Sequence, residues 1–217
     1  MIDNQEEKNA ALKLRIESVK RIQGKAILLL SDGQLVPMPR AMLKERPYRG
    51  GMPFDREAHA QFIQTRSYSF ALQKAVSLLA ARSRTEQEIV TALRRNAYPE
   101  EAIAHAMAKL HAAGYLNDVD FAEQWTNSRI QRGIGTQRVK IELRRKGIDQ
   151  DTIDKTISTI DDESLLDSAL NIAQKSARGK DLHLPADRQK VLAALARRGF
   201  DYSISKRALE QLKNNEI

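Results

Sequence analysis

Apolar positions along most of this chain recur with the period of an amphipathic helix. Pairs four residues apart, such as Ile89 and Leu93, are followed by longer series such as Ile153, Ile157 and Ile160. This spacing places the apolar side chains on one face of a helix, where they can pack against a core. The pattern therefore predicts a mainly α-helical fold from about residue 68 to the end.

The first 40 or so residues have a different pattern. RIESVKRI and KAILLL are short apolar-rich runs, and SDGQ, between KAILLL and LVPMP, places Asp32 and Gly33 at a hairpin turn. Pro37 and Pro39 end this region or confine it to an edge strand. We predict a small N-terminal antiparallel sheet, followed by the Gly- and Pro-rich loop ERPYRGGMPFD.

One sequence motif occurs three times in the helical part. It appears as LRRNAYPEEAI from Leu93, as LRRKGIDQDTI from Leu143 and as LARRGFDYSI from Leu195, at separations of 50 and 52 residues. Each copy joins the end of one predicted helix to the start of another, and a further amphipathic helix precedes the pair. Because a unit this small buries its apolar face poorly alone, we predict a tandem array of three-helix units.

These patterns divide the chain into five predicted parts. They are a β-hairpin or small-sheet extension (1–50), a linker with a short helix (51–66), and three-helix repeats at 67–114, 115–161 and 162–217.

The middle helix of each unit has predicted end signals. The predicted N-caps are Thr85 (in a capping box with Glu88), Thr136 and Asp187. Gly147 and Gly199 follow the second and third of these helices and are expected to have a positive φ. In the first copy either Ala97 or its neighbour Asn96 takes that conformation.

Composition narrows the class of protein. The chain has 217 residues, 41% of them apolar but only 5% aromatic, and no cysteine, so a disulfide framework and a thiolate metal site are excluded. No apolar run approaches the roughly 20 residues that span a bilayer, and the start, MIDNQEEKNA, lacks the apolar core of a signal peptide. We expect a soluble, cytoplasmic protein that is a monomer.

Charge points to polyanionic partners. The net charge is +8, and seven of the residues from Arg129 to Lys146 are basic against one acid, Glu142. From Asp149 to Glu163 the balance reverses, with six acids and one lysine. Basic residues also recur at matched places, just after each first helix and at the end of each second helix. The candidate nucleic-acid or filament contacts are Arg82, Arg95, Arg129, Arg132, Arg138, Lys140, Arg144, Arg145, Lys146, Arg178, Arg197 and Arg198.

Part of this basic placement has a structural explanation. Cations near a helix C-terminus are favoured by the helix dipole, whatever they bind. A purely solvated face would normally mix both signs of charge, which the middle unit does not. We therefore weigh binding above solvation there.

The usual marks of an enzyme are missing from the sequence. There is no P-loop, and the GIG at residues 133–135 lacks the rest of a dinucleotide fingerprint. His105 and His111 share a predicted helix but lie six residues apart, on opposite faces. His59 and His183 are far from them in the sequence. We predict no catalytic residues, no cofactor and no metal ligands.

Two acidic groups and one aromatic residue have structural interpretations. The acids of NDVDFAE and the group at residues 161–163 stand at predicted helix starts, where capping and the dipole favour them over a cation site or a catalytic cluster. Trp125 lies four residues after Phe121 on an apolar stripe, which favours a core position over base stacking.

Sequence-specific DNA recognition by a helix-turn-helix is disfavoured. The segment TQRVKIELRRKGIDQDTIDKTI has two helices joined by a glycine turn, but the second helix carries Asp149, Asp151 and Asp154. In that motif the second helix enters the major groove between the phosphates. An acidic recognition helix would be repelled there.

Several segments resemble the RecX family, regulators of the RecA recombinase. They are AARSRTEQEIVTAL, AAGYLNDVDFAEQW, RIQRGIGTQRVKIELRRKGI and ARRGFDYSI, and the resemblance covers about residue 67 to the end. The sheet-like start is similar to an N-terminal extension in some members. Ala97 departs from the glycine often found at its position.

The resemblance implies an extended, curved row of three-helix repeats that binds the RecA–DNA filament. It also implies inhibition of RecA ATPase, strand exchange and co-protease activity, binding to single- and double-stranded DNA, and a place in DNA repair, recombination and the SOS response. The residues alone leave a second function open, that of a non-specific helical-repeat DNA-binding architectural protein.

Overall fold

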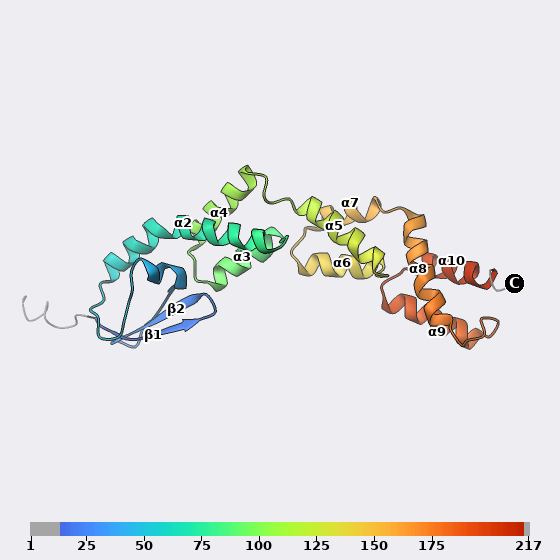
Figure 1. Ribbon diagram of the computed structural model, residues 1–217, viewed down its shortest axis with the longest axis horizontal. Coiled ribbons are helices and arrows are strands. Elements are labelled where there is room, and N and C mark those ends of the chain that lie inside the picture. The colour runs from blue at the N-terminus through green and yellow to red at the C-terminus, as the bar shows by residue number, and fades with distance from the viewer. Residues whose placement is uncertain (1–13, 215–217) are drawn as a thin grey trace, which may run out of the picture. The chain divides into compact units, whose positions relative to one another are not determined.

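The computed structural model describes residues 14–214, which form two compact units divided between Leu116 and Asn117 (Figure 1). The predicted change from strands to helices is confirmed. Strands β1 (Ile16–Ile22), β2 (Lys25–Leu30) and β3 (Leu35–Pro39) form one antiparallel sheet, and residues 56–214 contain no strand.

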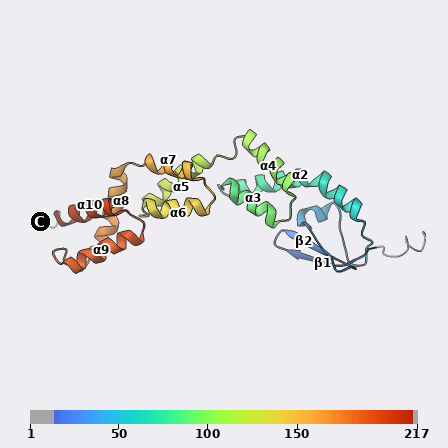
Figure 2. The same ribbon diagram turned by 180° about the vertical axis from the view of Figure 1, so that it is seen from behind.

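The remaining regular elements of both units are helices. They are the 3₁₀ helix η1 (Arg40–Lys44), α2 (Arg56–Ala81), α3 (Glu86–Arg95), α4 (Glu100–Ala112), α5 (Asp118–Gln131), α6 (Thr136–Arg145), α7 (Gln150–Ser158), α8 (Asp162–Ala177), α9 (Pro185–Arg197) and α10 (Tyr202–Asn214). In the second unit, α8 packs against both α9 and α10, as the view from behind also shows (Figure 2).

The sheet has two tight turns, of which the sequence pattern predicted one. Gly33, at the predicted turn, has φ +81°, and Asp32 Oδ1 accepts a hydrogen bond from the Gln34 N–H at 3.0 Å. The unpredicted turn joins β1 to β2 at Gln23 and Gly24, both with positive φ, as a two-residue hairpin turn requires. β3, which contains both prolines, is an edge strand, as expected.

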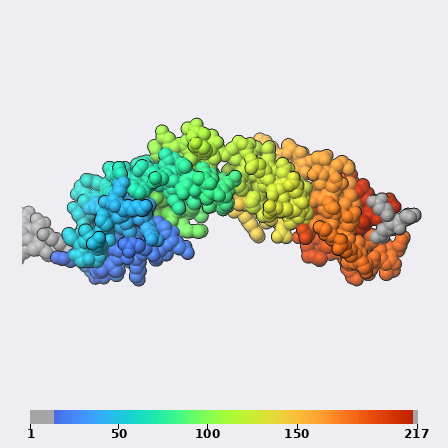
Figure 3. Space-filling view, viewed as in Figure 1, coloured from blue at the N-terminus to red at the C-terminus, as the bar shows by residue number. Residues whose placement is uncertain are grey.

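The sheet is covered by η1 and by the first half of α2. Ile16, Leu28, Leu30, Met38 and Met42 are fully buried and form the centre of this core. Residues from the following loop and from α2 complete it, and the sheet and helix lie directly against each other in the space-filling view (Figure 3, blue and cyan).

Polar contacts fasten α2 to the loop before it. The Tyr48 hydroxyl and His59 Nδ1 share a buried hydrogen bond of 2.8 Å, and the Arg46 guanidinium donates to the Ala58 carbonyl at 2.6 Å. Burial, with a smaller contribution from the charge of Arg46, lowers the pKa of His59 to about 4. The histidine is therefore neutral at physiological pH.

Helix α2 is longer than the sequence analysis supposed. It runs without interruption from Arg56 to Ala81, so the expected division between a linker with a short helix (51–66) and a first repeat (67–114) falls inside one helix. Asp55 caps its start, accepting from the Glu57 and Ala58 N–H groups, and no glycine or proline interrupts it. Its first half packs on the sheet and its second half packs against α3 and α4.

The threefold sequence motif forms the same turn in each copy. Leu93, Leu143 and Leu195 are fully buried, and their carbonyl groups each accept a hydrogen bond at 3.2 Å from the residue five positions later. Gly147 and Gly199 have φ of +85° and +89°, as predicted. The donors of these three hydrogen bonds are the N–H groups of Tyr98, Ile148 and Phe200, and all three residues are buried.

The first copy makes this turn without a glycine. Ala97 itself has φ +62°, whereas Asn96 has φ −84°, so the alternative that placed Asn96 in the left-handed region is wrong. The left-handed position is fixed by the hydrogen bonds on both sides of it, including Ala97 N–H to the Arg94 carbonyl at 2.9 Å.

Two of the three predicted N-caps are wrong. Thr85 accepts from the Glu88 N–H at 3.2 Å, as expected. Thr136 is instead the first residue of α6, because Gly135 precedes it in extended conformation with its backbone engaged elsewhere. Asp187 is instead the third residue of α9, within its first turn, since Pro185 occupies the first helical position, which its fixed φ suits.

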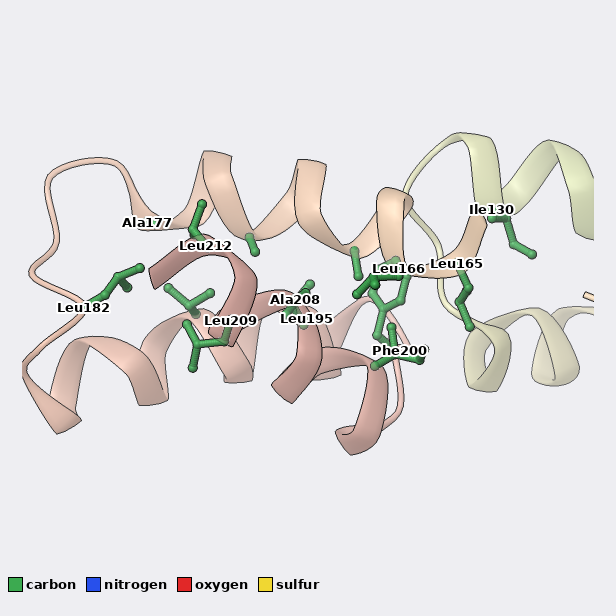
Figure 4. Close-up of a cluster of buried hydrophobic side chains, with 14 residues drawn as sticks. Ile130, Leu165, Leu166, Ala177, Leu182, Leu195, Phe200, Ala208, Leu209 and Leu212 are labelled. Atoms are coloured by element: carbon green, nitrogen blue, oxygen red, sulfur yellow. The ribbon is translucent and has the colours of Figure 1, made fainter. Parts of the chain in front are cut away.

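The second and third three-helix groups share contacts within the second unit. Ile130 of α5 belongs to the same buried cluster as Leu165 and Leu166 of α8 and Phe200 of the turn between α9 and α10 (Figure 4). The Ser168 hydroxyl donates to the Ile130 carbonyl at 2.6 Å.

Backbone hydrogen bonds complete this joint. The Gly135 N–H donates to the Arg198 carbonyl at 2.9 Å, and the Gln137 N–H donates to the Gly199 carbonyl at 3.0 Å. A Cβ on Gly135 would lie 2.2 Å from the Phe200 nitrogen, so only glycine permits this approach.

Gly135→Ala should destabilise the second unit by about 2 kcal/mol or more, because the added methyl group meets backbone atoms that cannot rotate away. Since Gly135 has an ordinary φ of −76°, this variant tests the close contact alone. Urea unfolding followed by circular dichroism measures the loss. In Gly179→Ala the added methyl meets nothing within 4 Å and only the φ of +70° is strained, so about 1 kcal/mol is expected. Equal losses in the two variants would contradict the proposed steric role.

His59 should make the first unit less stable as pH falls from about 6.5 to about 4. Its folded pKa lies below its unfolded value, so in that interval the unfolded chain binds a proton that the folded chain does not. Thermal melts across this range should show a falling midpoint. His59→Phe should lower stability at pH 7, through loss of the Tyr48 bond, but should flatten the pH dependence. A slope that persists in His59→Phe would contradict this assignment.

Candidate nucleic-acid interface

The predicted basic residues occupy equivalent places on successive helices. Arg82, Arg132 and Arg178 are the C-caps of α2, α5 and α8, and Arg95, Arg145 and Arg197 are the last residues of α3, α6 and α9. All six are exposed. Each therefore adds its charge at the negative end of a helix dipole, which stabilises the helix while leaving the guanidinium accessible.

Three arginines come together where the second and third helical groups meet. Arg132, Arg138 and Arg198, here called the joint cluster, are all exposed. Arg198 Nη1 lies 3.4 Å from the carbonyl of Gly133, the neighbour of Arg132. A Cβ built on Gly199 would lie 2.5 Å from the Arg138 Cβ, so the backbone at Gly199 is in close contact with Arg138.

The joint cluster is only partly neutralised. Arg138 lies 3.6 Å from Glu142, which also pairs with Arg129 at 2.7 Å. Arg132 and Arg198 have no acidic partner among residues 14–214. The charges of these two arginines, which come from different helical groups, are thus not neutralised by an acid of the described residues.

Trp125 occupies a half-buried position and contacts two of the predicted basic residues. Arg129 and Lys146 each lie 4.2 Å from the centre of its ring, and Glu142 accepts from its Nε1–H at 3.2 Å. Phe121 stacks beside it at 5.8 Å. Trp125 packs against the apolar cluster of α5–α7, as predicted, and Arg129 and Lys146 are engaged in holding it there.

The sorting of charge between α6 and α7 reflects pairing across the two helices. Lys140 Nζ lies 3.0 Å from Asp154, and Arg144 Nε donates to Gln150 at 2.8 Å. Hydrogen bonds from Gln150 and Lys140 hold the pKa of Asp154 below its ordinary value. Arg145, by contrast, has no ion-pair partner in the described part of the chain.

The twelve predicted contact residues therefore differ in how far their charges are already paired within the chain. Arg82 pairs with Glu88 at 3.2 Å, and Arg129, Lys140, Arg144 and Lys146 contact groups of their own chain. Within the described residues, the ones that are exposed and lack an acidic partner are Arg95, Arg132, Arg144, Arg145, Arg178, Arg197 and Arg198, of which Arg144 donates to the Gln150 amide and Arg198 to the Gly133 carbonyl.

The acidic groups have the structural roles that were expected of them. Asp118 and Asp120 lie in the first turn of α5, which Asn117 caps by accepting from the Val119 and Asp120 N–H groups, and Asp161 caps α8 by accepting from the Ser164 N–H at 3.0 Å. Across residues 14–214 no group of three or more histidine and carboxylate side chains is placed to hold a metal ion. None of the helices in that range is both long and apolar enough to cross a bilayer.

Glu142→Gln should destabilise the second unit by about 1 kcal/mol, since it removes the charge that pairs with half-buried Arg129 while keeping an acceptor for the indole. Trp125 is the only tryptophan of the chain, so its fluorescence reports unfolding here. In Glu210→Gln, whose pair with Lys206 is long and exposed, no measurable change is expected. A loss of equal size in both variants would contradict the role given to Glu142.

Comparison with known proteins agrees with this architecture. Models of the first, second and third three-helix domains of RecX match residues 71–110, 117–157 and 162–209. The regulatory protein RecX of Mycolicibacterium smegmatis is 31% identical over 172 residues, covering 76% of this chain and 91% of that protein. The RecX of Mycolicibacterium vanbaalenii is 34% identical over 136 residues, covering 59% and 74%.

Solved structures share the fold. A crystal structure of a regulatory protein RecX aligns with a TM-score of 0.61 at 23% identity over 89% of this chain and 97% of its own. RecX from Lactobacillus salivarius gives 0.64 at 22% identity, over 69% and 98%. The relatives are named as regulatory proteins, in keeping with the non-enzymatic function expected from the sequence. With three matching domains in tandem and a relative covered over nine-tenths of its length, this chain belongs to the RecX family of regulatory proteins.

Proposed function

We propose that this protein binds the RecA–DNA filament and lowers the ATPase, strand-exchange and co-protease activities of RecA. The observation that carries the proposal is the equivalent placement of exposed arginines at the helix ends of three tandem domains. A repeated ligand surface is the natural partner of a repeated set of contacts. A nucleoprotein filament offers such a surface, with phosphates at regular spacing.

The DNA contacts are proposed to be with phosphates and to ignore sequence. The available guanidinium groups stand at helix ends and at the joint cluster, whereas α7 presents Asp151 and Asp154 on exposed positions. Phosphate contacts carry no base identity. Affinity for single- and double-stranded DNA should therefore fall with salt in the same way for every sequence.

Binding to the filament should be tighter than binding to either component. When one chain contacts several neighbouring sites at once, the second and third contacts form at a high effective concentration. Bridging adjacent RecA subunits would also hinder the motions that accompany ATP turnover. Inhibition is thus expected with fewer regulators than recombinases.

An architectural DNA-binding protein is the second candidate, favoured by the same arginines. It would bind bare DNA at least as tightly as a RecA filament. Anisotropy titrations of labelled single-stranded DNA, with and without bound RecA and ATP, separate the two functions.

Sub-stoichiometric amounts of the protein should lower the DNA-dependent ATPase of RecA from the same organism. Replacing Arg132, Arg144, Arg145 and Arg197 with Glu should relieve this inhibition and weaken binding to every DNA about equally, because phosphate attraction becomes repulsion. Steady-state ATPase assays at low salt, titrated with each protein, provide the measurement.

The matched control places Glu at four lysines outside the proposed surface, Lys109, Lys155, Lys206 and Lys213, and changes the net charge equally. It should inhibit much more strongly than the arginine variant. If the wild-type protein leaves ATPase and strand exchange unchanged at a one-to-one ratio, the proposal fails and the architectural function replaces it.

A further inference from the structure

The first unit contains a basic pocket that none of the twelve predicted contact residues lines. It has a volume of about 410 Å³ and is lined by Arg21 of β1, Arg40 and Lys44 of η1, and Lys74 of α2, together with Asn96 and Tyr98. These side chains come from separate elements of the sheet and the first helical group. Strand β1 and helices α2 and α3 are labelled in Figure 1. We call this site the N-terminal basic pocket.

No acid lines the N-terminal basic pocket, and its four cations have no ion-pair partner in the described residues. The acid next to Lys44 in the sequence is Glu45, but Arg66 holds both of its oxygens at 2.6 and 2.7 Å. Those hydrogen bonds from Arg66 lower the pKa of Glu45. No ion pair of the described residues therefore compensates the positive charge of the pocket.

Helix dipoles do not explain this grouping. Arg21 lies on a strand and Lys74 in the interior of a 26-residue helix, so neither is at a helix C-terminus. Four like charges around one hollow repel each other, and this lowers the stability of the unit when the pocket is empty. An anionic ligand would relieve the repulsion.

The walls of the pocket are held together at Gly24. Its φ of +96° forms the β1–β2 turn, and its carbonyl accepts a hydrogen bond from the Arg40 N–H at 2.9 Å. A Cβ on Gly24 would lie 1.9 Å from the Asn96 Oδ1, so the end of α3 rests directly on the turn. The hairpin, η1 and α3 thus present their side chains from a fixed framework.

The remaining lining suits a sugar–phosphate chain. Ala41 and Leu43 supply a small apolar surface, and the Asn96 amide can donate or accept hydrogen bonds. Tyr98 keeps its proton, because burial raises the pKa of its hydroxyl to about 12. Arg21, Arg40 and Lys44 are exposed, so the pocket is open to a strand that passes across it.

We propose that the N-terminal basic pocket binds consecutive backbone phosphates of a nucleic acid strand, as a DNA contact separate from the arginines of the helical repeats. The sheet unit would then be a binding element in its own right. The inference rests on the proposed function only in taking DNA as the ligand.

The test compares two double variants of the full-length protein. Arg40→Gln with Lys74→Gln removes two charges from the pocket. Lys20→Gln with Arg49→Gln removes two exposed charges from the same unit, outside the pocket. Anisotropy with a labelled oligo-dT strand is measured over a series of salt concentrations, after circular dichroism has shown that both variants are folded.

The pocket variant should bind the strand about tenfold more weakly at low salt and should reduce the slope of log affinity against log salt by about 1.4, the value for two lost phosphate contacts on a single strand. The control should change affinity by less than about twofold. Equal effects of the two variants would overturn the proposal.

A free phosphate compound is the other source of the same chemistry. Thermal shift with inorganic phosphate or ATP distinguishes it, since a pocket variant that loses this shift but keeps its DNA affinity would overturn the DNA assignment.

The RecA ATPase assay separates this inference from the proposed function. Loss of DNA affinity in the pocket variant with no inhibition by the wild type would leave the pocket standing and remove the regulator function. Inhibition by the wild type, together with unchanged DNA affinity in the pocket variant, would support the regulator function and overturn the DNA contact at the pocket.

Discussion

The helical architecture depends on one backbone turn that is made three times. Leu93, Leu143 and Leu195 are fully buried, and the carbonyl of each accepts a hydrogen bond from a buried residue five positions later. The turn reverses the direction of the chain. The buried leucine before the turn and the buried residue after it are thereby kept in the same core. Because a left-handed residue is needed between them, the motif tolerates little variation there, and Ala97 occupies that position under strain that glycine would not have.

The same helix ends that make the turns also carry the exposed arginines. A cation at a helix C-terminus is stabilised by the dipole, so the fold favours positive charge at the places where each repeat can present it. Structure and binding therefore place no opposing demands on these positions. Inside the helical groups the demands differ: Arg129 and Lys146 hold Trp125, and Lys140 pairs with Asp154, so their charges are largely used by the chain itself.

Local patterns predicted the helices, the sheet, the hairpin at Gly33 and the equivalence of the helix-end arginines, because each depends on neighbours in the sequence. The wrong cap at Asp187 has a local cause, Pro185 at the first helical position, but the wrong cap at Thr136 came from contacts between distant residues. Gly135 serves as a cap because its backbone meets residues more than 60 positions away, and the Arg198 side chain reaches Gly133 across 65 positions. The N-terminal basic pocket had no sequence signal for the same reason, since its cations come from separate elements with no common spacing.

The continuity of α2 has a consequence for synthesis on the ribosome. Its first half closes the core of the sheet through Phe62 and Ile63, and the strands and loop that complete this core all precede it in the chain. The sheet can therefore fold as soon as the early part of α2 has emerged, which shortens the time for which its apolar face is exposed. The folded sheet then holds one end of a helix whose other end is still being made. The first helical group is thus assembled on a helix that is already anchored, so its slow nucleation step has been passed before α3 appears.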